Sequence, residues 1–62
     1  MNELLQFFEY THLPYHLQDL SKRFHDLAHS LALDTSETQE LNMALRKLLE
    51  AKDCAVRANL LI

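Results

Sequence analysis

Four histidines are the first residues of this chain whose type and spacing suggest chemistry. His25 and His29 are four residues apart, and so are His12 and His16. In a helix, this spacing places the two imidazoles of a pair on one face, as in many zinc sites. The same spacing also arises on ordinary helix surfaces, so a pair is necessary for such a site but is weak evidence for one.

A complete zinc site needs a third or fourth ligand, and helical spacing does not supply it here. Neither Glu9 nor Asp26 is forced onto the face that His25 and His29 share. A single cysteine with no Cys-x-x-Cys pair also excludes a thiolate site. We therefore expect surface or interface histidines on the polar side of a helix, with no metal and no other cofactor.

The available nucleophiles do not form a catalytic group. They are Ser21, Ser30, Ser36 and Cys54, and only Ser21 has a base, His25, one helical turn away. Two residues on adjacent turns are not an activated pair without a third, orienting group and a pocket. Cys54 is expected to be a small packed residue. The sequence therefore predicts a protein that is not an enzyme.

The basic residues are more informative because they are few and grouped. Beside aromatic rings, they suit a small ligand that carries phosphate and a base, since cations bind phosphate and a ring face stacks on the base. Phe8, Tyr10 and Tyr15 precede Lys22 and Arg23. The alternative is that these charges only solvate helix faces, where residues of opposite charge pair one turn apart. The basic residues are Lys22, Arg23, Arg46, Lys47, Lys52 and Arg57.

Two helices are predicted to position these residues. Pro14 suits the first turn of a helix over residues 14–33, and residues 12–14 are expected to enter it as an extended strap. A polar turn over 34–37 follows, in which Ser36 and Gln39 have the form of a capping box, although Thr35 and Thr38 offer a second register. The second helix is predicted over 38–60 and the amino-terminal arm over 1–13. The first apolar stripe is Leu17, Leu20, Phe24, Leu27 and Leu31; the second is Leu41, Leu45, Leu48 and Ala55, flanked by Ala44, Ala51 and Ala58.

These elements predict one all-α domain, an antiparallel two-helix hairpin with a short amino-terminal helix or arm. Because a 62-residue core barely offsets conformational entropy, we expect it to assemble into a symmetric helical oligomer. The net charge of −3 argues against binding DNA or RNA, and the apolar runs are too short to span a membrane. With no glycine, the chain has no dinucleotide-binding or P-loop motif. We expect a soluble, intracellular protein.

Four motifs together resemble a known family of small phage proteins. Nearly the whole chain resembles the helical-hairpin domain shared by phage anti-CBASS and anti-Thoeris sponges, which bind the cyclic nucleotide messengers of bacterial immune systems and withhold them from effectors. The motifs are FEYTHLP at 8–14, LQ at 17–18, FHDLA at 24–28 and ALRKLLEAKDCAVRA at 44–58.

The resemblance implies a hexamer that binds cyclic dinucleotides, and in some members cyclic trinucleotides, without cleaving them. It implies a stacking aromatic from the strap, Tyr10 or Phe8, with His12 beside it in the strap, and a basic residue of the first helix, Lys22 or Arg23. Arg57 is a further candidate phosphate contact. The implied location is the cytoplasm of an infected bacterial host. The alternative function is an oligomeric helical hairpin that docks or regulates another protein.

Overall fold

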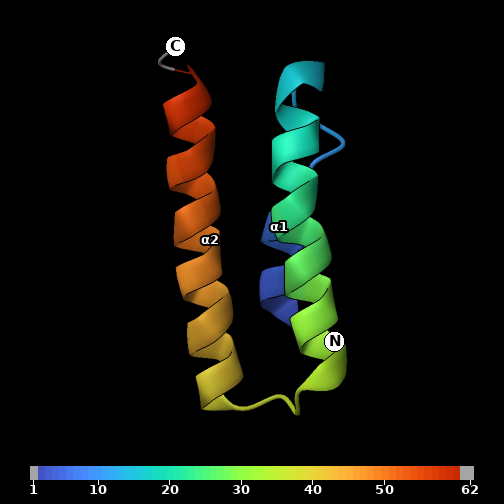
Figure 1. Ribbon diagram of the computed structural model, residues 1–62. Helices are drawn as coiled ribbons and strands as arrows, with labels where there is room; N and C mark the ends of the chain where they lie inside the picture. Colours follow the sequence, from blue (N-terminus) through green and yellow to red (C-terminus); the bar gives the residue numbers. More distant parts are fainter. Residues whose placement is uncertain (1, 61–62) are drawn as a thin grey trace.

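The computed structural model describes residues 2–60, which form three helices (Figure 1). They are a 3-10 helix η1 at Glu3–Phe8, the α-helix α1 at Tyr15–Asp34 and the α-helix α2 at Gln39–Leu60. The two long helices run antiparallel, and η1 packs against both of them. The prediction of an all-helical chain with two long paired helices is thus confirmed.

The first long helix begins one residue after Pro14, which has extended backbone angles (φ −52°, ψ 145°). The carbonyl of Pro14 accepts the amide of Leu17 at 2.9 Å, which closes the first turn. Pro14 therefore precedes the helix as its N-cap residue, where its lack of an amide hydrogen costs nothing. The helix ends at Asp34, one residue beyond the predicted boundary.

The strap before α1 contains a turn over residues 10–13, so the prediction of an extended segment over residues 12–14 holds for Pro14 but was wrong for His12. The amide of Leu13 donates to the carbonyl of Tyr10 at 3.1 Å, and this bond folds the strap back on itself. The side-chain amide of Gln18 donates to the carbonyls of Leu13 at 3.0 Å and Thr11 at 3.3 Å. Gln18 thus fastens the turn to the first turn of α1.

Thr38, rather than Ser36, caps the second long helix. Its hydroxyl accepts the amide of Leu41 at 3.1 Å, and its carbonyl accepts the amide of Asn42 at 3.0 Å. The capping box of Ser36 with Gln39 was therefore the wrong register. The physical reason is that Gln39 is the first helical residue, so Thr38 alone lies at the position from which a side chain reaches the amide three residues on.

The core lies where η1 meets the two long helices. Its centre is formed by Leu5, Phe8, Ala28, Leu41 and Leu45, all buried. Because η1 covers part of α1, the buried face of α1 is rotated from the predicted stripe. Leu27, predicted to be in the core, is 48% exposed, and the flanking alanines 44, 51 and 58 of α2 are exposed.

A buried lysine joins the amino-terminal segment to α2. Lys52 is only 8% exposed, and its ammonium donates to the carbonyl of Phe7 at 2.7 Å. Near the other end of η1, the side chain of Asn2 accepts the amide of Leu4 at 2.8 Å and donates to the side chain of Asn42. The segment predicted as a short helix or arm is thus a short helix, η1, which is hydrogen-bonded to α2 at both ends.

Within residues 2–60, neither long helix has an apolar stretch of the length needed to cross a membrane.

Candidate functional site

A shallow hollow beside the strap brings together two of the predicted ligand-binding residues. Its volume is about 220 Å³, and its lining includes Tyr10 from the strap and Lys22 from α1. Tyr15, at the first turn of α1, also lines it and is 90% exposed. Gln18, which holds the strap turn, and Asp19 complete the lining. Two aromatic rings and one ammonium group therefore border the same open hollow.

The ammonium of Lys22 is held by a carboxylate one turn further along α1. Its Nζ lies 2.7 Å from Oδ2 of Asp26. The hydrogen bond and charge of Asp26 raise the pKa of Lys22 above its ordinary value, so Lys22 stays protonated. In return, the hydrogen bonds from Lys22 and then from His25 lower the pKa of Asp26. Both side chains remain about half exposed, so the ammonium is accessible to an anion.

Arg23 has a different position from Lys22. It lies outside the hollow lining, and its guanidinium lies 3.2 Å from the carboxylate of Asp19. Asp19 does line the hollow, where its charge opposes an incoming phosphate. Arg23 partly offsets the charge of Asp19 from outside the hollow.

The structure separates three other predicted site residues from the hollow. The prediction of Phe8 as a stacking aromatic was wrong, because its ring is fully buried in the core and has no face to offer a ligand. His12 is exposed on the strap turn but is not part of the lining. Arg57 lies in the last turn of α2 with its Nη2 3.5 Å from Sγ of Cys54. Cys54 itself is exposed, not packed as predicted.

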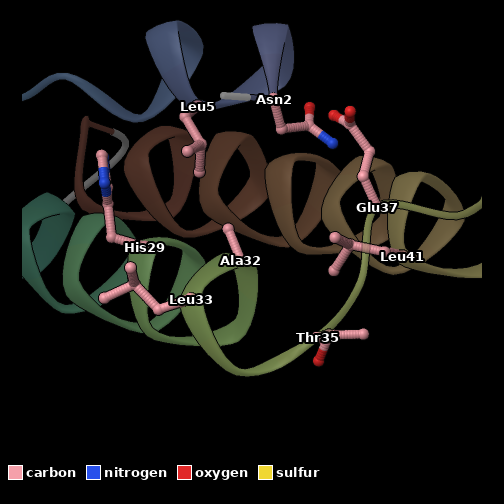
Figure 2. A pocket seen from close by; sticks show the side chains of 8 residues that line it. All are labelled: Asn2, Leu5, His29, Ala32, Leu33, Thr35, Glu37 and Leu41. Carbon is pink, nitrogen blue, oxygen red and sulfur yellow. The ribbon is translucent and has the colours of Figure 1, made fainter.

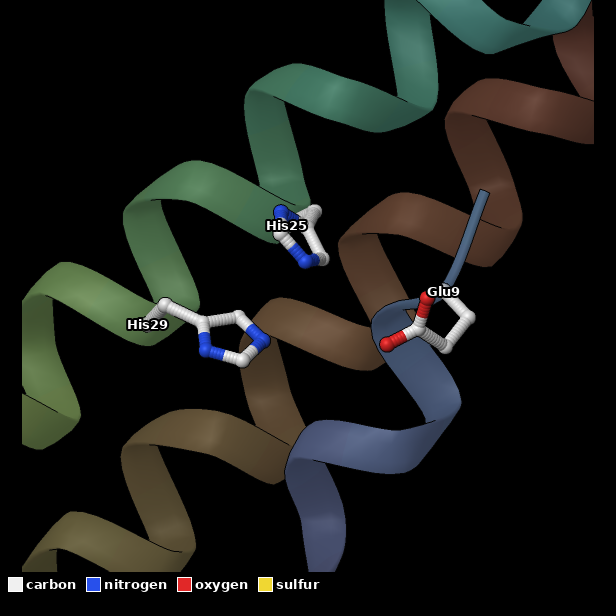
Figure 3. Close-up of side chains that lie close together, drawn as sticks. All are labelled: Glu9, His25 and His29. Atoms are coloured by element: carbon white, nitrogen blue, oxygen red, sulfur yellow. The ribbon is translucent and has the colours of Figure 1, made fainter. Parts of the chain in front are cut away.

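The structure places a carboxylate beside a histidine pair that the sequence left incomplete. Ligand atoms of Glu9, His25 and His29 all lie within 4.8 Å of one another. Both imidazoles project from successive turns of α1 toward the Glu9 carboxylate, which follows η1 (Figure 3). The Tyr10 ring packs edge-on against His25, with ring centroids 5.1 Å apart. This Glu9, His25 and His29 cluster therefore adjoins the hollow.

The serine predicted to lie one turn from His25 is not paired with it. Ser21 is fully buried, and its hydroxyl has no hydrogen-bond partner among residues 2–60. Nδ1 of His25 is instead 3.0 Å from Oδ1 of Asp26.

A second hollow, of about 270 Å³, lies at the end of the hairpin that carries the turn (Figure 2). It brings no lysine or arginine to a ligand, and Glu37 contributes a carboxylate. That chemistry disfavours a phosphate-bearing ligand. Its lining consists of Asn2, Leu5, His29, Ala32, Leu33, Thr35, Glu37 and Leu41.

No protein family model matches the sequence, and no curated protein and no solved structure matches it either.

Proposed function

We propose that this chain binds cyclic oligonucleotide messengers, holds them intact and so withholds them from immune effectors, as a phage anti-defence sponge acting on CBASS-type signalling. The observation that supports this most directly is the hollow bordered by Tyr10, Tyr15 and Lys22. Cyclic dinucleotides are the proposed ligands, with cyclic trinucleotides as a second class. The site of action is the cytoplasm of the infected host.

The chemistry of the hollow matches the two parts of such a ligand. A nucleobase stacks on an aromatic face, and Tyr15 offers a ring that is 90% exposed. Tyr10 lies against His25, which limits the positions its ring can take. A phosphate binds the Lys22 ammonium, whose pKa Asp26 raises further above neutral pH. When phosphate binds, Lys22 exchanges or shares its contact with Asp26.

One copy of the chain provides only part of a site. Pockets for small ligands have volumes of roughly 300 to 1,000 Å³, whereas this hollow has about 220 Å³ and is open. We propose that a second copy completes it. A dyad between two copies would present two Lys22 ammonium groups to the two phosphates of a cyclic dinucleotide. By resemblance, the assembly is a hexamer.

We infer binding without turnover because the carboxylate in the hollow, Asp19, is paired with Arg23 and no serine or cysteine lines the hollow. Its hydroxyl groups are the phenols of Tyr10 and Tyr15, and its lining contains no histidine. The one enclosed serine, Ser21, has a buried hydroxyl that no ligand can reach from the surface. Incubation with a cyclic dinucleotide should therefore return it uncleaved.

Calorimetric titration with a panel of cyclic di- and trinucleotides tests the proposal. We expect submicromolar binding of at least one member. Tyr10→Ala and Lys22→Ala should each weaken binding by about 1 to 3 kcal/mol, whereas Lys47→Ala, an exposed lysine on α2, should not change it. Absence of submicromolar binding across the panel would refute the function. If the Tyr10 and Lys22 variants bind as tightly as the unchanged chain, the assignment of the site is refuted.

A helical hairpin that docks or regulates a protein is the second candidate, and exposed apolar side chains favour it. Leu27 and Met43 are about half exposed, and Leu33 is 86% exposed. Such side chains suit a partner surface as well as contact between copies. Native mass spectrometry separates the two candidates, because the sponge implies a hexamer, while a hairpin that needs a partner would be a monomer or dimer alone.

A further inference from the structure

We propose that Glu9, His25 and His29 form a Zn²⁺ site that ties the amino-terminal segment to α1. Two imidazoles and one carboxylate are a donor set that zinc prefers, with the fourth position open to water. The proposal depends on these three side chains and does not depend on nucleotide binding. The nucleotide titrations described above therefore neither support nor refute the zinc site.

The three side chains need only small movements to bind one ion. Their ligand atoms lie within 4.8 Å of one another. Zinc bonds of about 2.0 to 2.2 Å in tetrahedral geometry place ligand atoms roughly 3.3 Å apart, so each pair must close by at most about 1.5 Å. The two rings are already adjacent, with centroids 4.2 Å apart and planes tilted by 39°. Glu9 is exposed, so its carboxylate is able to rotate toward them.

His29 provides independent support, because one of its ring nitrogens lacks a partner. Nε2 of His29 is buried and makes no hydrogen bond among the described residues. Buried polar atoms in folded proteins are nearly always paired, so an unpaired one calls for an explanation. A bound zinc ion would supply the missing partner.

His25 is oriented for the same role by a residue behind it. Its Nδ1 lies 3.0 Å from Oδ1 of Asp26, which leaves Nε2 as the remaining ring nitrogen. A carboxylate that holds the second nitrogen of a zinc-binding histidine fixes its tautomer and makes it a stronger ligand. The carboxylate of Asp26 is itself held by the ammonium of Lys22 at 2.7 Å. The group that orients the His25 ring is therefore fixed in place.

The consequence of the site is a cross-link between segments far apart in sequence. Glu9 follows η1, whereas His25 and His29 belong to the middle of α1. Zinc would therefore hold η1 and the strap against the hairpin. A chain of 62 residues gains much from such a cross-link, because its core alone contributes little net stability.

Zinc titration of the metal-free protein, followed by calorimetry and by thermal unfolding, tests the site. We expect one zinc ion per chain and a melting temperature about 20 °C higher when free zinc is at about a hundred times Kd. His29→Ala and Glu9→Gln should each weaken binding at least about tenfold and reduce this shift. His16→Ala is the matched control, because His16 is exposed on the same helix outside the cluster, and it should bind as the unchanged chain does.

Cobalt supplies a second readout that does not depend on stability. Bound at this site, Co²⁺ should give the intense visible absorption of four-coordinate cobalt, and His29→Ala should abolish it. Glu9→Gln keeps an exposed side chain of the same shape, so it tests the site without disturbing the core. The proposal is overturned if zinc does not bind saturably in the micromolar range. It is equally overturned if His16→Ala weakens binding as much as His29→Ala does.

Discussion

Replacing Lys52 tests whether the amino-terminal segment is held by a specific hydrogen bond or only by apolar packing. The ammonium of Lys52 donates to the carbonyl of Phe7 at 2.7 Å, and the side chain is almost completely buried. Lys52→Met keeps an unbranched apolar stem but removes the donor. Lys52→Ala removes both, so the two variants separate the two contributions.

The expected magnitude comes from four effects, two that stabilise the fold and two that oppose them. A hydrogen bond from a charged donor contributes about 1.5 to 3 kcal/mol, and the three methylene groups beyond the β-carbon contribute roughly 0.8 kcal/mol each when buried. Against this, both variants end the desolvation of the ammonium, and Lys52→Ala also restores about 2 kcal/mol of side-chain entropy, whereas Lys52→Met does not because methionine loses about as much entropy as lysine. We therefore expect Lys52→Met to lower the free energy of unfolding by about 1 kcal/mol and Lys52→Ala by about 1.5 kcal/mol.

Urea unfolding followed by circular dichroism measures these changes, at one fixed protein concentration because self-association would alter the apparent stability. Lys47→Ala, an exposed lysine of the same helix, is the control and should change stability by less than about 0.5 kcal/mol. Amide hydrogen exchange should accelerate over residues 3–8 in both Lys52 variants. If Lys52→Met is as stable as the unchanged chain, the hydrogen bond to Phe7 contributes nothing to stability, and only apolar packing holds the amino-terminal segment.

Three further changes test the fold and the charges beside the hollow. Ser21→Ala should raise the free energy of unfolding by up to about 1 kcal/mol in urea titration, because the buried hydroxyl of Ser21 has no partner among the described residues. If the free energy of unfolding instead falls by about 1 kcal/mol, the hydroxyl is paired. Thr38→Ala should cost about 1 kcal/mol through loss of the cap, while Ser36→Ala should be neutral in the same assay. Lys22→Ala should raise the pKa of Asp26 toward its ordinary value, measured by NMR of the carboxyl carbon. Because the folded pKa of Asp26 is lowered, the stability that it contributes is present at neutral pH and is lost as pH falls below about 4. An unchanged pKa in Lys22→Ala would contradict the assignment of Lys22 as the main cause.

The features predicted correctly from the sequence are local ones. Apolar residues at three- and four-residue spacing indicate the two helices, and the polar segment between them indicates the turn. The position of η1 could not be predicted in this way, because it depends on contacts across the whole chain. The hydrogen bond of Lys52 with Phe7 joins residues 45 positions apart. A lysine between Ala51 and Asp53 gives no sign that its stem will be buried against another helix.

The same limit explains why the sequence did not identify the third ligand of the proposed zinc site. His25 and His29 share a face through helical spacing alone, which the sequence shows directly. Glu9 joins them only because η1 packs against α1 and directs the residue after it toward the histidines. A signal was present, since the chain has a carboxylate immediately after the apolar arm. Nothing in its spacing, however, relates that carboxylate to a helix that begins six residues later.

Phe8 and Tyr10 show how the core and the proposed site depend on each other. Both were candidates for the stacking ring, and the structure gives them opposite environments two residues apart. Phe8 is fully buried, whereas Tyr10 borders the hollow and touches His25. Because so few residues separate the buried ring from Pro14 at the start of α1, burial of Phe8 fixes where the strap can run. Phe8 therefore acts as a positioning residue, and the hollow can form only when η1 is docked on the hairpin.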